Sequence, residues 1–272
     1  MKHLILGSSG QIGGHLVKYL LSKGEQVFEY DIEIKDWMDL KQGHSPVLDA
    51  YIDACDIIHF LAYDVGGAKY LEKNQDSFEF ISNNMKIMTN VFEHIRRFHK
   101  PFIFASSQMA EMGYSSYGML KALGEKMTQD SGGIIARFWN VYGYEEDEEK
   151  SHVITDFIKM AKNDSSITMR TDGTESRQFL YADDACEALF ALAKNYKKID
   201  KSQNYSITSF EWTKIYEIAQ ILDVLSSCDI HPGDKKDETQ HNAMNEPNNN
   251  IKEYWEPKTT LEEGIMKLYN MY

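Results

Sequence analysis

The sequence predicts an α/β fold: a doubly wound parallel sheet with a small C-terminal lobe. Apolar runs of strand length alternate with helical patterns over the first 140 residues, and a glycine-containing turn follows the first run. The chain has 272 residues, of which 42% are hydrophobic. This is enough apolar material for one large domain or two interlocked ones.

Composition excludes several functional classes. The net charge of −13 argues against a nucleic-acid partner, because phosphate binding needs a basic surface. No run of about 18 apolar residues exists, so no membrane span is expected, and the first residues lead directly into a glycine turn rather than a signal peptide. Cys55, Cys186 and Cys228 lack metal-ligand spacing, so we expect free thiols, a cytoplasmic location and no metal site.

The first three predicted elements form a βαβ unit. Residues 2–6 are an apolar strand, residues 12–21 have helical spacing that ends near Gly24, and residues 26–30 form a second strand. The turn between the first strand and the helix reads Gly7-Ser8-Ser9-Gly10-Gln11-Ile12-Gly13. At such a turn the helix N-terminus can accept a pyrophosphate, and glycine lets the backbone approach it closely.

Asp31 ends the second strand, 18 residues beyond Gly13. An acidic side chain at about this distance meets the adenosine ribose in dinucleotide-binding units. A carboxylate there accepts from the 2′-hydroxyl and repels a 2′-phosphate, so NAD rather than NADP is the predicted cofactor. The predicted contacts from the turn are Gly7, Gly10, Gln11, Ile12 and Gly13. The alternative is a similar βαβ unit that binds no dinucleotide.

Tyr117 and Lys121 lie four residues apart in a predicted helix, so both side chains can point into one cavity. A free phenol has a pKa near ~10, and a neighbouring cation lowers that pKa, so a proton can be exchanged near pH ~7. Ser107 follows the apolar run 101–106 and can hold a substrate oxygen against the phenol. The alternative is a surface helix with a half-buried tyrosine, which the upstream dinucleotide fingerprint disfavours.

These motifs resemble those of the short-chain dehydrogenase/reductase superfamily. The GxxGxxG spacing of residues 7–13 is similar to that of its extended branch, the NAD-dependent sugar-nucleotide epimerases, dehydratases and reductases. The branch's serine, tyrosine and lysine are matched by Ser107, Tyr117 and Lys121. The resemblance spans residues 7–264 and implies a Rossmann-like fold, NAD as cofactor and a nucleoside-diphosphate sugar as substrate.

The resemblance implies further cofactor contacts in the middle of the chain. Asp39 and Leu40 lie in the polar segment 32–55, which has no clear element. Leu61 and Ala62 end the run 56–62, which looks like the family's fourth strand. His59 within that strand is expected to be a core residue. Asn84 is expected to support the cofactor-carrying strand, to cap a helix over residues 85–98, or both.

Two departures from the family pattern concern the reaction. Dehydratases carry an Asp-Glu pair after the serine or threonine, and reductases that epimerise at C3 and C5 carry a cysteine there, whereas this chain has Gln108-Met109. The segment from Ser107 to Tyr117 is also shorter than is typical, which removes a loop that often covers the sugar. A 4,6-dehydratase is therefore not expected, and Ser107 and Gln108 are predicted to contact the substrate.

The later motifs imply a diphosphate site. Residues 134–143 resemble the family's R-x-x-N-V-Y-G, in which the asparagine contacts the nucleotide diphosphate. The resemblance implies the same contact for Asn140. Residues 173–184 resemble G-x-x-x-R-D-F-V-Y-V-x-D, where Arg177 grips the same group, although a surface arginine is the alternative. No arginine follows it, so a lysine in the predicted loop or lid 229–250, Lys235 or Lys236, would have to replace the family's second arginine.

The remaining segments receive structural predictions. The acidic run 145–149 is expected to be a solvated loop rather than a metal site, because consecutive carboxylates do not converge. The other predicted elements are a helix over 185–195 capped by Asp183 or Asp184, a strand over 204–207, a helix over 212–225 and a helix after Pro257.

We therefore predict an NAD-binding Rossmann domain from residues 1–140 and 174–200 and a substrate-binding lobe from 141–173 and 201–272. The resemblance implies hydride transfer at a ring carbon, C4 in preference, with Tyr117 as acid/base and Lys121 also holding the nicotinamide ribose. Epimerase, dehydrogenase and ketoreductase are alternatives within this chemistry. A non-catalytic NAD(H)-binding sensor or scaffold is the alternative outside it. Family members often pair through the Tyr117 helix, so a homodimer is expected.

Overall fold

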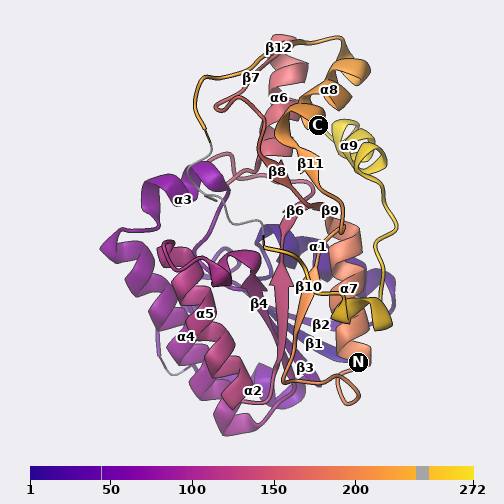
Figure 1. Ribbon diagram of the computed structural model, residues 1–272. Helices are drawn as coiled ribbons and strands as arrows, with labels where there is room; N and C mark the ends of the chain where they lie inside the picture. The colour runs from indigo at the N-terminus through magenta and orange to yellow at the C-terminus, as the bar shows by residue number, and fades with distance from the viewer. Residues whose placement is uncertain (44, 237–244) are drawn as a thin grey trace.

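The protein is described by a computed structural model that covers residues 1–43, 45–236 and 245–272 (Figure 1). A parallel six-stranded sheet forms the larger part of the molecule, and a smaller lobe stands at one end of it. In spatial order the strands are β2 (Gln26–Tyr30), β1 (Lys2–Leu6), β3 (Ile57–Phe60), β4 (Phe102–Ser107), β5 (Ile134–Phe138) and β10 (Asn204–Ile207). The predicted doubly wound α/β fold is confirmed.

The direction of winding reverses at β1, which has β2 on one side and β3 on the other. Leu6 at the end of β1 pairs with both Tyr30 and Phe60 in parallel register, so three carboxyl ends lie side by side. Such a reversal opens a crevice at the carboxyl edge of the sheet, where ligands bind in open α/β folds.

Helices cover both faces of the sheet because successive strand residues point to opposite sides. Ile5 packs into the core under α1 and α7, whereas Leu4 and Leu6 pack into the core under α2, α4 and α5. The bounds are α1 (Gln11–Ser22), α7 (Ala182–Lys194), α2 (Pro46–Ala54), α4 (Phe78–Phe98) and α5 (Ser116–Asp130), with α3 (Ala68–Asn74) in the connection after β3.

The smaller lobe has its own core, which joins helices and short strand pairs from distant parts of the chain. Its helices are α6 (Val153–Asp164), α8 (Ile215–Ser226) and α9 (Leu261–Tyr269). The pairs are β7 (Ser166–Thr168) with β12 (Asp229–His231), β8 (Ser176–Arg177) with β11 (Thr213–Lys214), and β6 (Asn140–Tyr142) with β9 (Phe179–Tyr181). Short 3₁₀ turns are η1 (Asp36–Met38), η2 (Gln108–Glu111) and η3 (Asn250–Glu253).

Several predicted positions are wrong. The strand predicted as the fourth is β3, the third along the chain, because the described residues between β2 and β3 contribute η1, α2 and no strand. Helix α4 starts at Phe78, where the Ser77 hydroxyl accepts from the backbone N of Phe80 at 3.2 Å, so Asn84 is not its cap. Strand β10 pairs with β5 and belongs to the main sheet, although the sequence prediction placed residues 201–272 in the lobe.

Two further helix boundaries differ from prediction. Helix α7 begins at Ala182, so Asp183 and Asp184 occupy its first turn rather than its cap. Acidic groups there still stabilise the helix, because its N-terminus carries partial positive charge. Helix α8 begins at Ile215, three residues later than expected. Of the predicted loop 229–250, residues 237–244 lie outside the described part of the chain.

Candidate active site

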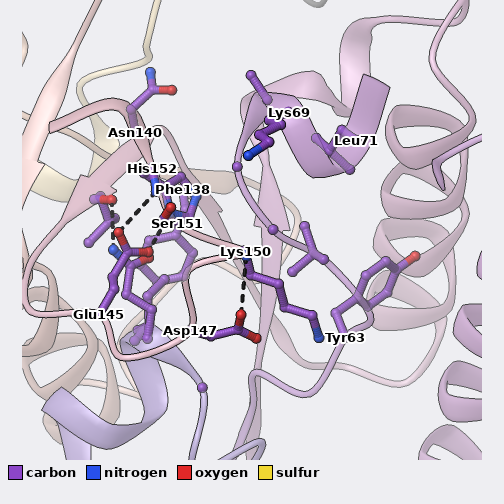
Figure 2. Close-up of a pocket in the computed structure, with 18 of the residues that line it drawn as sticks. Tyr63, Lys69, Leu71, Phe138, Asn140, Glu145, Asp147, Lys150, Ser151 and His152 are labelled. Atoms are coloured by element: carbon purple, nitrogen blue, oxygen red, sulfur yellow. Dashed lines mark hydrogen bonds and ion pairs between the residues drawn. The ribbon is translucent and has the colours of Figure 1, made fainter. Parts of the chain in front are cut away.

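A cleft of about 1120 Å³ lies between the carboxyl edge of the sheet and the smaller lobe. Figure 2 shows part of it, with Asn140, Glu145 and His152 on one side and Tyr63 and Lys69 on the other. Most predicted site residues line this cleft: Gly7, Gly10, Gln11, Ile12, Gly13, Asp31, Asp39, Leu40, Leu61, Ala62, Ser107, Gln108, Tyr117, Asn140 and Arg177. Asn84 and Lys121 are buried behind its wall.

The glycine turn forms one end of the cleft. Gly7 has φ +87°, and a Cβ there would lie 2.6 Å from the backbone N of Ala62. A Cβ at Gly13 would lie 1.9 Å from the carbonyl oxygen of Gly7, so α1 packs against the turn only because this residue is glycine. In the described part of the chain no side chain caps α1, and its first turn has no acidic residue. Its N–H groups and partial positive charge are therefore available to an anion.

Asp31 lies beside this turn at the end of β2. Its Oδ2 accepts from the backbone N of Ser9 at 2.9 Å, and its Oδ1 accepts from Glu33 N at 3.0 Å. Each carboxylate oxygen has a second lone pair, so both retain capacity to accept from a hydroxyl. Asp39 and Leu40 line the cleft nearby, and the Leu40 carbonyl is held by Asn90 Nδ2 at 2.9 Å.

Asn84 supports the loop after β3 from inside helix α4. Its Oδ1 accepts from Asp64 N at 2.8 Å, and its Nδ2 donates to the carbonyl oxygens of Asp64 and Phe80, both at 3.0 Å. The side chain is fully buried and does not itself line the cleft. It therefore holds a loop that borders the glycine turn, and its role toward the cofactor stays a prediction.

Helix α5 carries Tyr117 and Lys121 on one buried face. The helix begins at Ser116, because the Ser115 hydroxyl accepts from Gly118 N at 3.1 Å as an N-cap. Lys121 Nζ donates to the carbonyl oxygen of Ala105 at 2.7 Å and lies 3.6 Å from the centroid of the Tyr63 ring. The lysine is therefore anchored to β4 and covered by an aromatic ring.

The predicted lowering of the Tyr117 pKa is wrong for this arrangement. Burial raises the pKa of Tyr117 to about 12, and a side-chain hydrogen bond with Ser107 acts in the opposite direction but is weaker. Burial also lowers the pKa of Lys121 to about 7, against the effect of the Glu125 carboxylate. Desolvation outweighs the attraction between the two groups because Lys121 donates to a carbonyl and not to the phenol.

The connection from Ser107 to α5 is compact. Ser107 Oγ accepts from Met109 N at 3.2 Å and begins the 3₁₀ turn η2, in which Gln108 is buried. The Gln108 carbonyl accepts from Asn245 Nδ2 at 2.8 Å, which ties the turn to a distant segment. Both Ser107 and Gln108 line the cleft next to Tyr117.

Residues from the lobe form the other side of the cleft. Asn140 lies in β6 opposite Phe179, and its Nδ2 donates to the Gln178 carbonyl at 3.4 Å. Arg177 lies in β8, where one guanidinium N–H donates to the Ser176 carbonyl at 2.7 Å. Lys235 and Lys236 also line the cleft, and Lys236 forms an ion pair with Asp172.

The acidic run is not uniformly solvated, which corrects the prediction. Glu145 is only 8% exposed, and its carboxylate accepts from His152 and Thr155. Sequence reasoning missed this pair, because neither periodicity nor a motif links residues seven apart in an irregular loop. Among the described residues there is no group of three or more His, Cys, Asp or Glu side chains placed to hold a metal ion.

The model of the NAD dependent epimerase/dehydratase family matches residues 3–208. The chain belongs to this family. It is similar to the UDP-N-acetyl-alpha-D-glucosaminuronate decarboxylase of Bacillus cytotoxicus, with 26% identity over 82% of this chain and 79% of that protein. It is also similar to GDP-mannose 3,5-epimerase 1 of Oryza sativa subsp. indica, with 27% identity over 97% of this chain and 80% of that protein.

The fold of the family is also seen in solved structures. UDP-glucuronic acid 4-epimerase from Bacillus cereus, solved as a variant with UDP-4-deoxy-4-fluoro-glucuronic acid and NAD, superposes with a TM-score of 0.83. The match covers 99% of this chain and 98% of that one at 20% identity. The predicted membership of the NAD-dependent epimerase/dehydratase family and the predicted Rossmann-like fold are confirmed.

NAD is the cofactor of this family, and the residues present fit it. The glycine turn leaves no room for a Cβ at Gly7 or Gly13, and the uncapped start of α1 faces the cleft, as a pyrophosphate requires. Asp31 at the end of β2 stands where a ribose hydroxyl is bound in such folds. No helix in the described ranges has the length and apolar character needed to cross a membrane.

Proposed function

We propose that the protein transfers hydride between NAD and a ring carbon, C4 in preference, of a nucleoside-diphosphate sugar. The observation that carries the proposal is that Tyr117 and Ser107 line the same cleft as the glycine turn and Asp31. The strand order β1-β3-β4 leads from that turn to Ser107 along the carboxyl edge, the path on which dinucleotides lie in this fold.

The chain's own residues supply proton transfer and positioning. Tyr117 takes the proton of the sugar hydroxyl, and Ser107 hydrogen-bonds the reacting oxygen. NAD held at the glycine turn and Asp31 would supply the hydride acceptor for the same carbon, and a positive charge near the phenol would favour its ionised form. Lys121 Nζ lies 5.7 Å from the centroid of the Tyr117 ring, so the ammonium form of Lys121 would favour the phenolate. Proton transfer of this kind contributes about 10²–10⁴-fold to rate.

Three outcomes share this chemistry. If the keto sugar takes hydride back on its other face, the protein is an epimerase, which is our first proposal. If the keto sugar leaves, the protein is a dehydrogenase, and in reverse a ketoreductase. Gln108 and Met109 stand where dehydratases have carboxyl groups, so we do not propose a 4,6-dehydratase. The matched decarboxylase acts on a sugar uronate, so uronate-containing substrates belong in any test.

The experiment mixes the protein with NAD and a panel of UDP-, GDP- and dTDP-linked sugars, including UDP-glucuronate. Reduced cofactor is followed by absorbance, and sugar conversion by NMR. Conversion or reduction with one sugar supports the enzyme. NAD binding without either signal over the whole panel contradicts the enzyme and favours a non-catalytic sensor or scaffold. Such a protein would have no need of Ser107, Tyr117 and Lys121.

We also propose a cytoplasmic homodimer that pairs through α4 and α5. Exposed apolar side chains lie seven residues apart on α4, at Phe78 and Met85, and four apart on α5, at Met119 and Leu123. This spacing gives each helix an outward apolar stripe. Sedimentation as a monomer at micromolar concentration would contradict the dimer, and Met119→Glu with Leu123→Glu should dissociate it.

A further inference from the structure

A histidine–carboxylate pair faces the cleft from the lobe side. His152 stands directly before α6, and its Nδ1 donates to Oε1 of Glu145 at 2.5 Å. Oε2 of the same carboxylate accepts from His152 N at 3.0 Å and from the Thr155 hydroxyl at 2.7 Å. Both members of the pair line the cleft, and Figure 2 shows them near Asn140 and Phe138.

The loop that carries Glu145 is fixed from behind. The Tyr272 hydroxyl donates to the Glu145 carbonyl at 2.8 Å and accepts from the Glu145 N–H at 2.8 Å. The ring of Tyr144 stacks on that of Tyr272 with centroids 5.0 Å apart. The carboxylate is therefore held in place without a ligand, and it fixes the orientation of the His152 ring.

This arrangement leaves one ring nitrogen for the cleft. The His152 side chain is 34% exposed, and within the described ranges its Nε2 makes no hydrogen bond. The Glu145 carboxylate raises the pKa of His152 above its ordinary value even though burial acts against this. When the ring is protonated, Nε2–H is a donor on the cleft side, and hydrogen bonds with a charged partner are stronger than neutral ones.

Two of the cations on this side of the cleft are already engaged in ion pairs. Arg170 forms an ion pair with Glu72, and Lys236 forms one with Asp172. No arginine follows Arg177 in the sequence. Arg177 and Lys235 also line the cleft, and His152 adds a donor whose orientation the Glu145 carboxylate already sets.

We propose that His152 is a substrate-binding residue that donates Nε2–H to an anionic oxygen of the substrate, with Glu145 as its positioning residue. The proposal rests on the proposed function, in which the ligand is a nucleoside-diphosphate sugar. Two sources of the anionic oxygen share this chemistry: the diphosphate, and a carboxylate on the sugar.

The experiment measures binding of UDP, UDP-glucose and UDP-glucuronate by calorimetry, with GDP as an alternative base, to the NAD-loaded protein. His152→Gln removes the charge while keeping a polar side chain. Lys162→Gln is the matched control, because it removes one positive charge from the same helix α6 at a position outside the cleft. NAD affinity and melting temperature report on the fold, which a merely structural role for His152 would change.

We expect His152→Gln to weaken binding by about 10- to 100-fold, the range for a hydrogen bond to a charged group, and Lys162→Gln to leave it unchanged. Equal weakening for all three ligands assigns the contact to the diphosphate, and weakening of UDP-glucuronate alone assigns it to the sugar carboxylate. Unchanged affinity in His152→Gln overturns the contact and leaves the proposed function standing. A wild-type protein that binds none of these nucleotides overturns both.

Discussion

Tyr117 and Lys121 share a face of α5 as their spacing predicts, yet their protonation depends on groups that the spacing does not reveal. Lys121 is anchored on the Ala105 carbonyl and covered by Tyr63, a residue that no motif identified. Both side chains are almost completely buried, at 8% and 3% exposure. Burial disfavours the charged form of each, which raises the pKa of the phenol and lowers that of the amine.

Tyr117→Phe is expected to lower kcat by about 10²–10⁴-fold, because it removes the group that transfers the proton and little volume. NAD affinity should stay within twofold of wild type, since the ring still fills its site. Steady-state rates and NAD titration followed by fluorescence would check this. Lys162→Gln, on α6 outside the cleft, is the control. Normal turnover by Tyr117→Phe would remove the phenol from the mechanism.

Asp31→Asn should shift the cofactor preference toward NADP. The substitution is nearly isosteric and removes the negative charge that repels a 2′-phosphate. We expect the ratio of the Kd for NADP to the Kd for NAD to fall about tenfold, which corresponds to about 1.4 kcal/mol. Titration of both cofactors at fixed ionic strength measures this ratio. An unchanged ratio would place the ribose away from Asp31.

At the scale of elements, the site is built where loops from separate strands meet. The glycine turn and the loop after β3 are in contact, and Asn84 in α4 holds the second loop through two hydrogen bonds to the backbone of Asp64. The sequence predicted the glycine turn well, because its constraint is local. The start of α4 was placed too late, because Asn84 was taken as a cap, whereas Phe80 and Ile81 before it belong to the helix and pack on the core.

Asn84→Ala should destabilise the loop after β3. It leaves the partly buried backbone N–H and carbonyl of Asp64 without these partners, at a cost of about 1–3 kcal/mol in the free energy of unfolding. Weaker NAD binding should accompany that loss. Asn195→Ala is the control, since its side chain donates to the Ala191 carbonyl at the end of α7 and holds no loop of the cleft. Chemical denaturation combined with NAD titration would show both effects, and loss of stability with unchanged NAD affinity would separate the loop from the cofactor.

At the scale of the whole molecule, the centre of the sheet contains a buried histidine pair. His3 Nδ1 and His59 Nε2 lie 3.0 Å apart on neighbouring strands, and both side chains are fully buried. Burial lowers the pKa of His3 to about 4 and that of His59 to about 3. The expectation that His59 is a core residue agrees with this position.

The pair should make the fold sensitive to acid. Both histidines have lower pKa values folded than unfolded, where they are near 6.5, so the unfolded chain binds more protons between those values. Stability is therefore fully present above pH ~6.5 and is lost as the pH falls toward ~4. Urea denaturation across this range measures the slope. His59→Asn should flatten it, and an equal slope in that variant would show that other groups cause the acid sensitivity.

The sequence by itself determined the sheet, the glycine turn, the family and NAD, because each depends on short-range patterns: strand periodicity, backbone clearance at glycine and a carboxylate at a strand end. Only the tertiary structure decided which residues act together. It placed Tyr63 over Lys121, Glu145 against His152 and β10 beside β5. These contacts join segments that share no periodicity. Burial sets the protonation of the groups involved, and it is a property of the packed molecule and not of any one stretch of the chain.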